Sequence, residues 1–115
     1  MLLGPIHIEI IYQGEHMPAS QYMAETVEEV ISAYGDLICY TKIEYKKSKE
    51  HADRFCELSI ALYGEDAFRK SMQCAPIPSL FINGELIFDV IPPQEDLVAA
   101  IEAALKKHGL KGRKQ

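Results

Sequence analysis

The sequence contains no tryptophan and only three cysteines, Cys39, Cys56 and Cys74. Their number is odd and no two of them form a Cys-x-x-Cys pair, so they do not predict a disulfide framework. We therefore expect reduced thiols in a reducing compartment. The cysteines and the four histidines are too scattered for a zinc site, and a phosphate-binding glycine loop is also missing. The sequence thus predicts neither a metal nor another cofactor.

Long apolar runs are missing as well. None approaches the roughly 20 residues that a membrane-spanning helix needs, and the N-terminus lacks the basic residues and cleavage site of a signal peptide. We expect a cytoplasmic protein with no membrane partner. The net charge is −5, and because an acidic chain repels phosphate backbones, we expect no nucleic-acid partner. Five of the 12 basic residues fall within 106–115, which indicates a basic tail that frays.

The first half of the chain has the pattern of a strand–helix–strand unit. The 115 residues fit one domain, which we predict to span residues 1–115. Ile6–Tyr12 is β-branched and largely apolar, which predicts a strand. Pro18 to about Tyr34 has apolar residues at helical spacing, and Gly35 suits the end of that helix. Leu37–Tyr45 predicts a second strand, parallel to the first.

The second half predicts a helical pair, a hairpin and a last helix. Ser48 can cap a helix that runs to about Tyr63, and a shorter helix follows to about Gln73. Two prolines force 75–78 to be extended. Ser79–Ile82 and Glu85–Asp89 flank Asn83-Gly84, a strong signal for a two-residue hairpin turn. Gln94 to about Lys107 is amphipathic, with an acidic start and a basic end. The predicted order is β-α-β-α(α)-β-β-α.

The segment Ile77-Pro78-Ser79-Leu80-Phe81-Ile82-Asn83-Gly84 resembles the hydrophobic-Pro-Ser/Thr loop and central hairpin of the thioredoxin-like family. Most of the chain follows the family's element order, although 46–75 is longer than in a minimal thioredoxin. The resemblance implies an α/β fold of thioredoxin-like type, with a central mixed four-stranded sheet flanked by helices. It also implies that Pro78 is cis and that the Ile77 backbone faces the start of the first helix.

The same resemblance puts the family's Cys-Pro-x-Cys motif on Met17-Pro18-Ala19-Ser20. Thiol–disulfide exchange needs an attacking thiolate and a resolving thiol. A methionine thioether has no proton to lose, and a serine hydroxyl does not replace a thiol. We therefore expect no conventional dithiol chemistry at this site.

The residues that remain there could form a binding groove for an anion, a peptide or a thiol substrate. This candidate groove consists of Met17, Pro18, Ala19, Ser20, Ile77 and Pro78. His16 could contribute an imidazole or be a solvated loop residue, and Ser20 could bind a ligand or only support the first helical turn. Met17 could be an adaptable contact or a hydrophobic plug.

The cysteines offer a second possibility. Cys74 lies four residues before Pro78, with Arg69 and Lys70 nearby in sequence, and exposure with positive charge would make a thiol reactive. It could also pair with Cys56 if the helical pair folds back. Cys39 lies in an apolar strand and is expected in the core. His7, His51 and His108 are expected on the surface of the sheet or of helices.

Two functions follow from these features. The first is a redox-inactive binding or regulatory module that holds a peptide or protein partner, a second copy of the chain included, in the cis-proline groove. The alternative is a thiol-dependent oxidoreductase that relies on Cys74, with or without Cys56.

Overall fold

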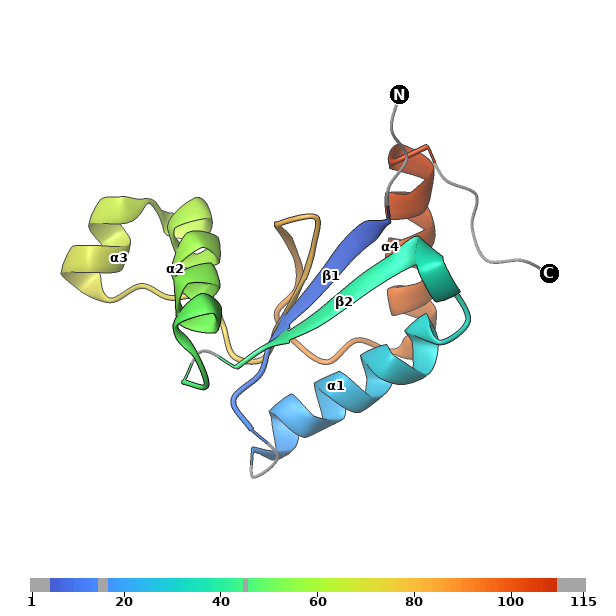
Figure 1. Ribbon diagram of the computed structural model, residues 1–115, viewed down its shortest axis with the longest axis horizontal. Coiled ribbons are helices and arrows are strands. Elements are labelled where there is room, and N and C mark those ends of the chain that lie inside the picture. Colours follow the sequence, from blue (N-terminus) through green and yellow to red (C-terminus); the bar gives the residue numbers. More distant parts are fainter. Residues whose placement is uncertain (1–4, 15–16, 45, 110–115) are drawn as a thin grey trace.

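A mixed four-stranded sheet flanked by helices forms the centre of the structure (Figure 1). The computed structural model describes residues 5–14, 17–44 and 46–109. The strands are β1 (Ile6–Ile11), β2 (Ile38–Ile43), β3 (Ser79–Ile82) and β4 (Glu85–Phe88). Their order across the sheet is β2-β1-β3-β4, with β1 and β2 parallel and the other pairs antiparallel. The predicted order of elements along the chain is confirmed.

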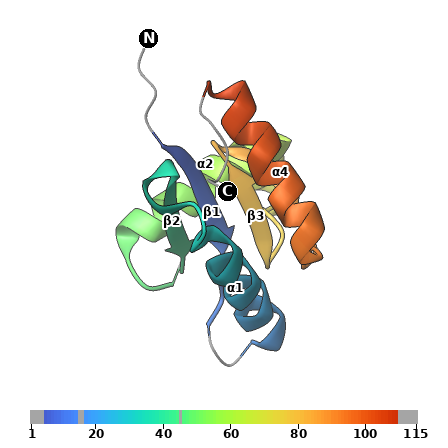
Figure 2. The ribbon, with the colours of Figure 1, turned by 90° about the vertical axis from the view of Figure 1, so that its right-hand side faces the viewer.

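Helices cover both faces of this sheet. They are α1 (Pro18–Ile31), α2 (Lys49–Tyr63), α3 (Glu65–Ser71) and α4 (Gln94–Lys107), with a short 3-10 turn, η1 (Gly35–Leu37). Helices α1 and α4 lie on one side of the sheet and α2 lies on the other, with α3 beside α2 and farther from the sheet (Figures 1 and 2). Helix α1 ends three residues before the predicted end, because the buried Tyr34 packs into the core from a turn rather than from the helix.

The larger core lies between the sheet and helices α1 and α4. Side chains alternate along a strand, so Ile6, Ile8 and Ile10 of β1 all point to this side and are fully buried. They pack against apolar residues of the two helices, which include Met23, Val27, Leu97, Ile101 and Leu105. This packing fixes where α1 begins relative to the end of β1.

The smaller core covers only part of the opposite face. Ile11, Ile43 and Phe81 meet Phe55 and Leu58 of α2 near the carboxyl end of β1. Towards the start of β1 the same face carries Cys39, which lies opposite the exposed His7 in the register. The prediction that Cys39 lies in the core is wrong. Its strand is at the edge of the sheet, and Cys39 is exposed rather than part of the smaller core.

The end of the chain departs from the predicted tail. Lys106 and Lys107 belong to α4, so the helix covers the first two residues of the predicted fraying segment 106–115. Residues 110–115 lie outside the described residues, as does His16. Within the described ranges, none of the helices combines the length and the apolar character needed to cross a bilayer.

Candidate functional site

Three segments that are far apart in the sequence meet at the carboxyl end of β1. The register pairs Ile11 of β1 with Ser79 of β3, and Leu80 of β3 with Phe88 of β4. The start of α1 follows β1, residues 74–78 precede β3, and residues 89–93 follow β4. All three segments therefore lie along the edge of the sheet that is formed by the ends of its strands, not by β2 or β4. Figure 1 shows the first two segments there.

Large apolar side chains are exposed at this edge. Met17 and Ile77 are each 36% exposed, Val90 is 64% exposed and Ile91 is 37% exposed. We call these four residues the apolar edge. Met17 and Ile77 were predicted from the sequence as groove residues, whereas Val90 and Ile91 were not. Two apolar residues directly before Pro92-Pro93 were the available signal, because a proline pair ends the strand and leaves its neighbours in a loop.

A buried side chain holds the start of α1 in place. Met17 is the N-cap residue and makes no side-chain cap, and Pro18 occupies the first turn. Among the described residues, no acceptor receives the backbone N–H of Ala19 or Ser20. The Ser20 side chain, 1% exposed, accepts a hydrogen bond from the backbone N–H of Gln13 at 3.2 Å. Of the predicted groove residues, Met17, Pro18 and Ala19 are exposed, whereas Ser20 supports the turn.

Two buried hydroxyls shape the segment 74–78. Ser59 of α2 accepts a hydrogen bond from the backbone N–H of Ala75 at 2.8 Å, and Ser79 donates to the carbonyl of Pro76 at 2.6 Å. The Ile77–Pro78 bond is cis, which confirms the prediction. In the part of the chain that the structure describes, nothing hydrogen-bonds to the backbone N–H or C=O of Ile77. This loop therefore presents an exposed apolar side chain and an unpaired peptide unit together.

The charged side chains beside the apolar edge form pairs of one acidic and one basic group. A hollow of about 200 Å³ lies beside the end of β1, and Glu44 and Lys47, 3.4 Å apart, are among the residues that line it. The Lys42 ammonium lies 4.7 Å from the centre of the Tyr12 ring and 3.7 Å from Glu28. Because the acidic and basic groups pair locally, the edge is better suited to an apolar ligand than to an isolated anion.

The cysteines do not gather at this edge. All three are free, so the possible pairing of Cys56 with Cys74 is not formed. Cys74 is half-buried and packs against the smaller core. Arg69, a predicted source of positive charge, is held by Glu65 at 2.7 Å.

The histidines are also apart. His7 is exposed, His108 is half-buried at the end of α4, and the half-buried His51 accepts the backbone N–H of Glu44 through Nδ1 at 2.9 Å. The surface position predicted for His51 is therefore only partly right, because this hydrogen bond draws the ring towards β2. Over the described ranges, no three potential metal-ligating side chains form a cluster.

The chain was compared with protein-family models and with curated proteins. Neither comparison found a match.

Proposed function

We propose that this chain is a thioredoxin-like domain without dithiol chemistry that binds an extended apolar segment of a protein partner along the apolar edge. The observation that carries the proposal is the Ile77 peptide unit, which has no hydrogen-bond partner among the described residues and lies at the same end of the sheet as other exposed apolar side chains. An extended peptide gains affinity from main-chain hydrogen bonds and specificity from contacts of its side chains. Both kinds of contact are offered here.

The residues at the start of α1 support binding over redox catalysis. Met17 presents a polarizable thioether, which adapts to irregular apolar partners but forms no disulfide. Ser20 is buried and already accepts a hydrogen bond from Gln13, so its hydroxyl is engaged in the fold. The proposed site thus offers apolar contacts but no nucleophile at Met17 or Ser20.

The alternative, a thiol-dependent oxidoreductase using Cys74, has less support. A reactive thiol needs access and positive charge. Cys74 is half-buried against the smaller core, and of the two cations near it in the sequence, Arg69 is paired with Glu65, which leaves Lys70. If Cys74 nevertheless alkylates faster than a free cysteine in a peptide, this alternative becomes the better one.

Selection from a library of random displayed peptides tests the binding proposal with a defined probe. We expect the selected peptides to be rich in apolar residues and to bind the purified chain in a fluorescence anisotropy titration. Ile77→Lys places a charge at the centre of the edge, and the affinity should fall at least tenfold. Met72→Lys is the matched control, because Met72 is an exposed apolar residue of the segment after α3 and lies outside the edge. Equal affinity of the two variants for the selected peptides would contradict the proposal.

A partner that is a second copy of this chain gives a separate result. Self-association would then appear in sedimentation velocity and would be lost in Ile77→Lys but kept in Met72→Lys. The absence of redox chemistry is tested by reduction of insulin with dithiothreitol, which the chain should not accelerate. An acceleration comparable to that of a dithiol thioredoxin would end the proposal.

A further inference from the structure

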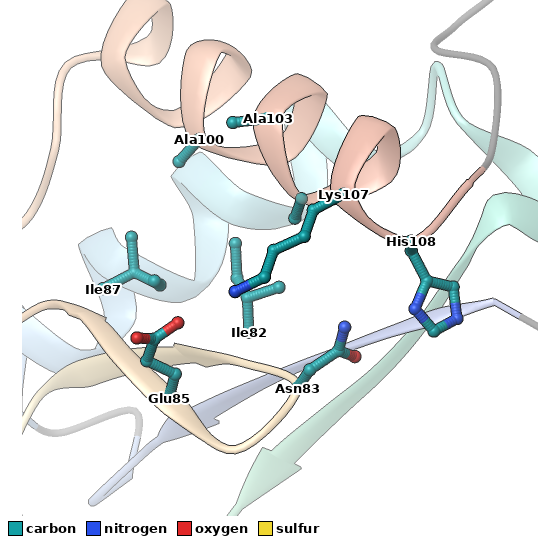
Figure 3. Close-up of a pocket in the computed structure, with 9 residues that line it drawn as sticks. Ile82, Asn83, Glu85, Ile87, Ala100, Ala103, Lys107 and His108 are labelled. Atoms are coloured by element: carbon teal, nitrogen blue, oxygen red, sulfur yellow. The ribbon is translucent and has the colours of Figure 1, made fainter.

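A second surface feature lies at the other end of β3, away from the apolar edge. A pocket of about 440 Å³ opens between α4 and the β3–β4 hairpin (Figure 3). Ile82 and Asn83, at the end of β3, line it, whereas the apolar edge lies next to Ser79, at the start of β3. The volume is within the range of small-molecule sites, about 300–1,000 Å³.

The floor of the pocket is apolar because of the pattern of α4. The large residues Leu97, Ile101 and Leu105 point into the core, and the alanines of the neighbouring stripe face the hairpin. Small side chains there leave space above Ile82 and Ile87. The apolar lining consists of Ile82, Ile87, Ala100, Ala103 and Ala104. A hydrocarbon chain placed on this floor would be removed from water, which is favourable in proportion to the apolar area buried.

Asn83 supplies a hydrogen-bond donor at one end of the pocket, and the Lys107 side chain reaches from that end towards Ile82 and Glu85 (Figure 3). Lys107 extends across the opening in Figure 3, and its ammonium has no ion-pair partner among the residues that the structure describes. Asn83 is fixed by two hydrogen bonds to His7 at 2.8 Å, one of which occupies its side-chain oxygen. The amide group of Asn83 is therefore left as a donor on the pocket side. His108 lines the same end.

Two features limit where a negative charge could bind. Glu85, also on the rim, repels an anion on its own side of the pocket. The last carbonyls of α4 carry partial negative charge, but the N–H groups of His108 and Gly109 bond to carbonyls of Ala104 and Lys106. Glu85 and Asn83 lie on opposite sides of the pocket in Figure 3, so an anionic head is favoured on the Asn83 side of Lys107.

An added β-strand is a poor occupant, although β4 is an edge strand. The strand has only four residues, and its ladder with β3 is irregular at Ile87, which has no partner in the register. Short strands and bulges at an edge discourage pairing with another chain. The same irregular edge disfavours a second copy of this chain in that role.

We propose that the pocket binds a small aliphatic carboxylate. Its hydrocarbon chain lies on Ile82, Ile87 and the alanines of α4, and its carboxylate accepts hydrogen bonds from Lys107 and Asn83. This site is independent of the apolar edge, so either proposal can fail alone.

Titration of the purified chain with octanoate, followed by amide chemical shifts, tests the proposal. We expect saturable binding that shifts the amides of Ile87 and Ala103 and leaves those of Met17 and Ile77 unchanged. Octanol, which has the same chain without the charge, should bind more weakly. Absence of saturable octanoate binding, or equal affinity for octanol, would overturn the proposal.

Paired variants separate the contribution of the ligand's carboxylate from that of its hydrocarbon chain. Lys107→Gln should weaken octanoate binding by about threefold, the effect of losing a solvent-exposed ion pair, whereas the neighbouring Lys106→Gln should not. Glu85→Gln should strengthen binding, because it removes a like charge from the rim. Ala100→Leu should abolish binding by filling the floor, and Ala99→Leu, exposed on the same helix, should not.

Two further results would count against the site. If Glu85→Gln weakens binding, the carboxylate does not lie where we place it. Sedimentation velocity tests whether a second copy of the chain occupies the pocket instead. That occupant is indicated by a dimer that octanoate does not dissociate, that Ala100→Leu disrupts and that Ala99→Leu leaves intact.

Discussion

The hydroxyl of Ser20 accepts a hydrogen bond from the backbone N–H of Gln13, and this contact ties the first turn of α1 to the end of β1. A second contact reinforces it, because the Tyr12 hydroxyl donates to the side chain of Gln21 at 2.8 Å. The backbone N–H of Met17 also donates to the carbonyl of Gly14 at 3.0 Å, so three hydrogen bonds hold this turn. Ser20 thus has a structural role of its own.

Loss of this contact should be measurable as a loss of stability. Ser20→Ala leaves the Gln13 N–H without its acceptor in a partly buried place, and we expect the free energy of unfolding to fall by about 1–2 kcal/mol. Urea denaturation followed by circular dichroism measures the change. Ser32→Ala is the control, because the Ser32 hydroxyl also makes a hydrogen bond, to the carbonyl of Glu29, but at an exposed position. If both variants lose the same stability, the Ser20 contact has no special role.

Redox chemistry is expected when cysteines replace both Met17 and Ser20. In the double variant Met17→Cys/Ser20→Cys, the first thiol is at a helix N-terminus, where the backbone dipole lowers a thiol pKa. The second thiol follows three residues later and can resolve a mixed disulfide. We expect the double variant to accelerate insulin reduction by dithiothreitol.

The single variant Met17→Cys is the control for that experiment. It supplies the attacking thiol without the resolving one, so it should stop at the mixed disulfide and turn over far more slowly. An inactive double variant that still unfolds cooperatively would show that the edge lacks the geometry of a dithiol site.

The elements that the sequence predicted best are bounded by prolines or by turn-forming residues. Strand β3 was predicted to the residue, because Pro78 precedes it and Asn83-Gly84 follows it. Both turn residues have positive φ, 50° and 83°, as a two-residue hairpin turn requires. Helix α1 was predicted too long, because a helical spacing of apolar residues continues to Tyr34 while the chain has already turned.

The properties that the sequence could not predict depend on which elements become neighbours. An apolar strand such as β2 looks buried until the strand order puts it at the edge, and Cys39 is exposed for that reason. The pocket under Lys107 likewise exists only because α4 crosses the hairpin with its alanines towards β4. Local patterns carry no information on such contacts.

The ion pair between α2 and the sheet should contribute to stability. Arg54 donates to both oxygens of Glu9, through Nε and one terminal nitrogen, each at 2.7 Å. This hydrogen bonding raises the pKa of Arg54 above its ordinary value. The Glu9 side chain is only 12% exposed, so removing its partner leaves a poorly hydrated carboxylate. We expect Arg54→Met to lower the free energy of unfolding by about 1–3 kcal/mol, less than for a fully buried pair.

A double-mutant cycle with Glu9→Gln isolates the interaction between the two side chains. The exposed pair Lys49–Asp53, at 2.8 Å, serves as the comparison and should show no measurable coupling. Arg54→Lys should recover only part of the stability, because an ammonium cannot form the two-pronged contact. A coupling between Arg54 and Glu9 no larger than that of the exposed pair would contradict the expectation.

Alkaline pH should destabilise the fold through Tyr40. Its partial burial, and the hydrogen bond its hydroxyl donates to Glu28 at 2.8 Å, raise the pKa of Tyr40 well above its ordinary value. In the unfolded chain the phenol loses its proton near pH 10, whereas in the folded chain it keeps it. The contribution of Tyr40 to stability is therefore complete below about pH 10 and decreases as the pH rises, by at most about 1.4 kcal/mol per pH unit.

Urea denaturation between pH 8 and pH 11 measures this slope, and Tyr40→Phe should make it shallower, because phenylalanine has no proton to lose. An equally steep decline in that variant would assign the alkaline sensitivity to other groups.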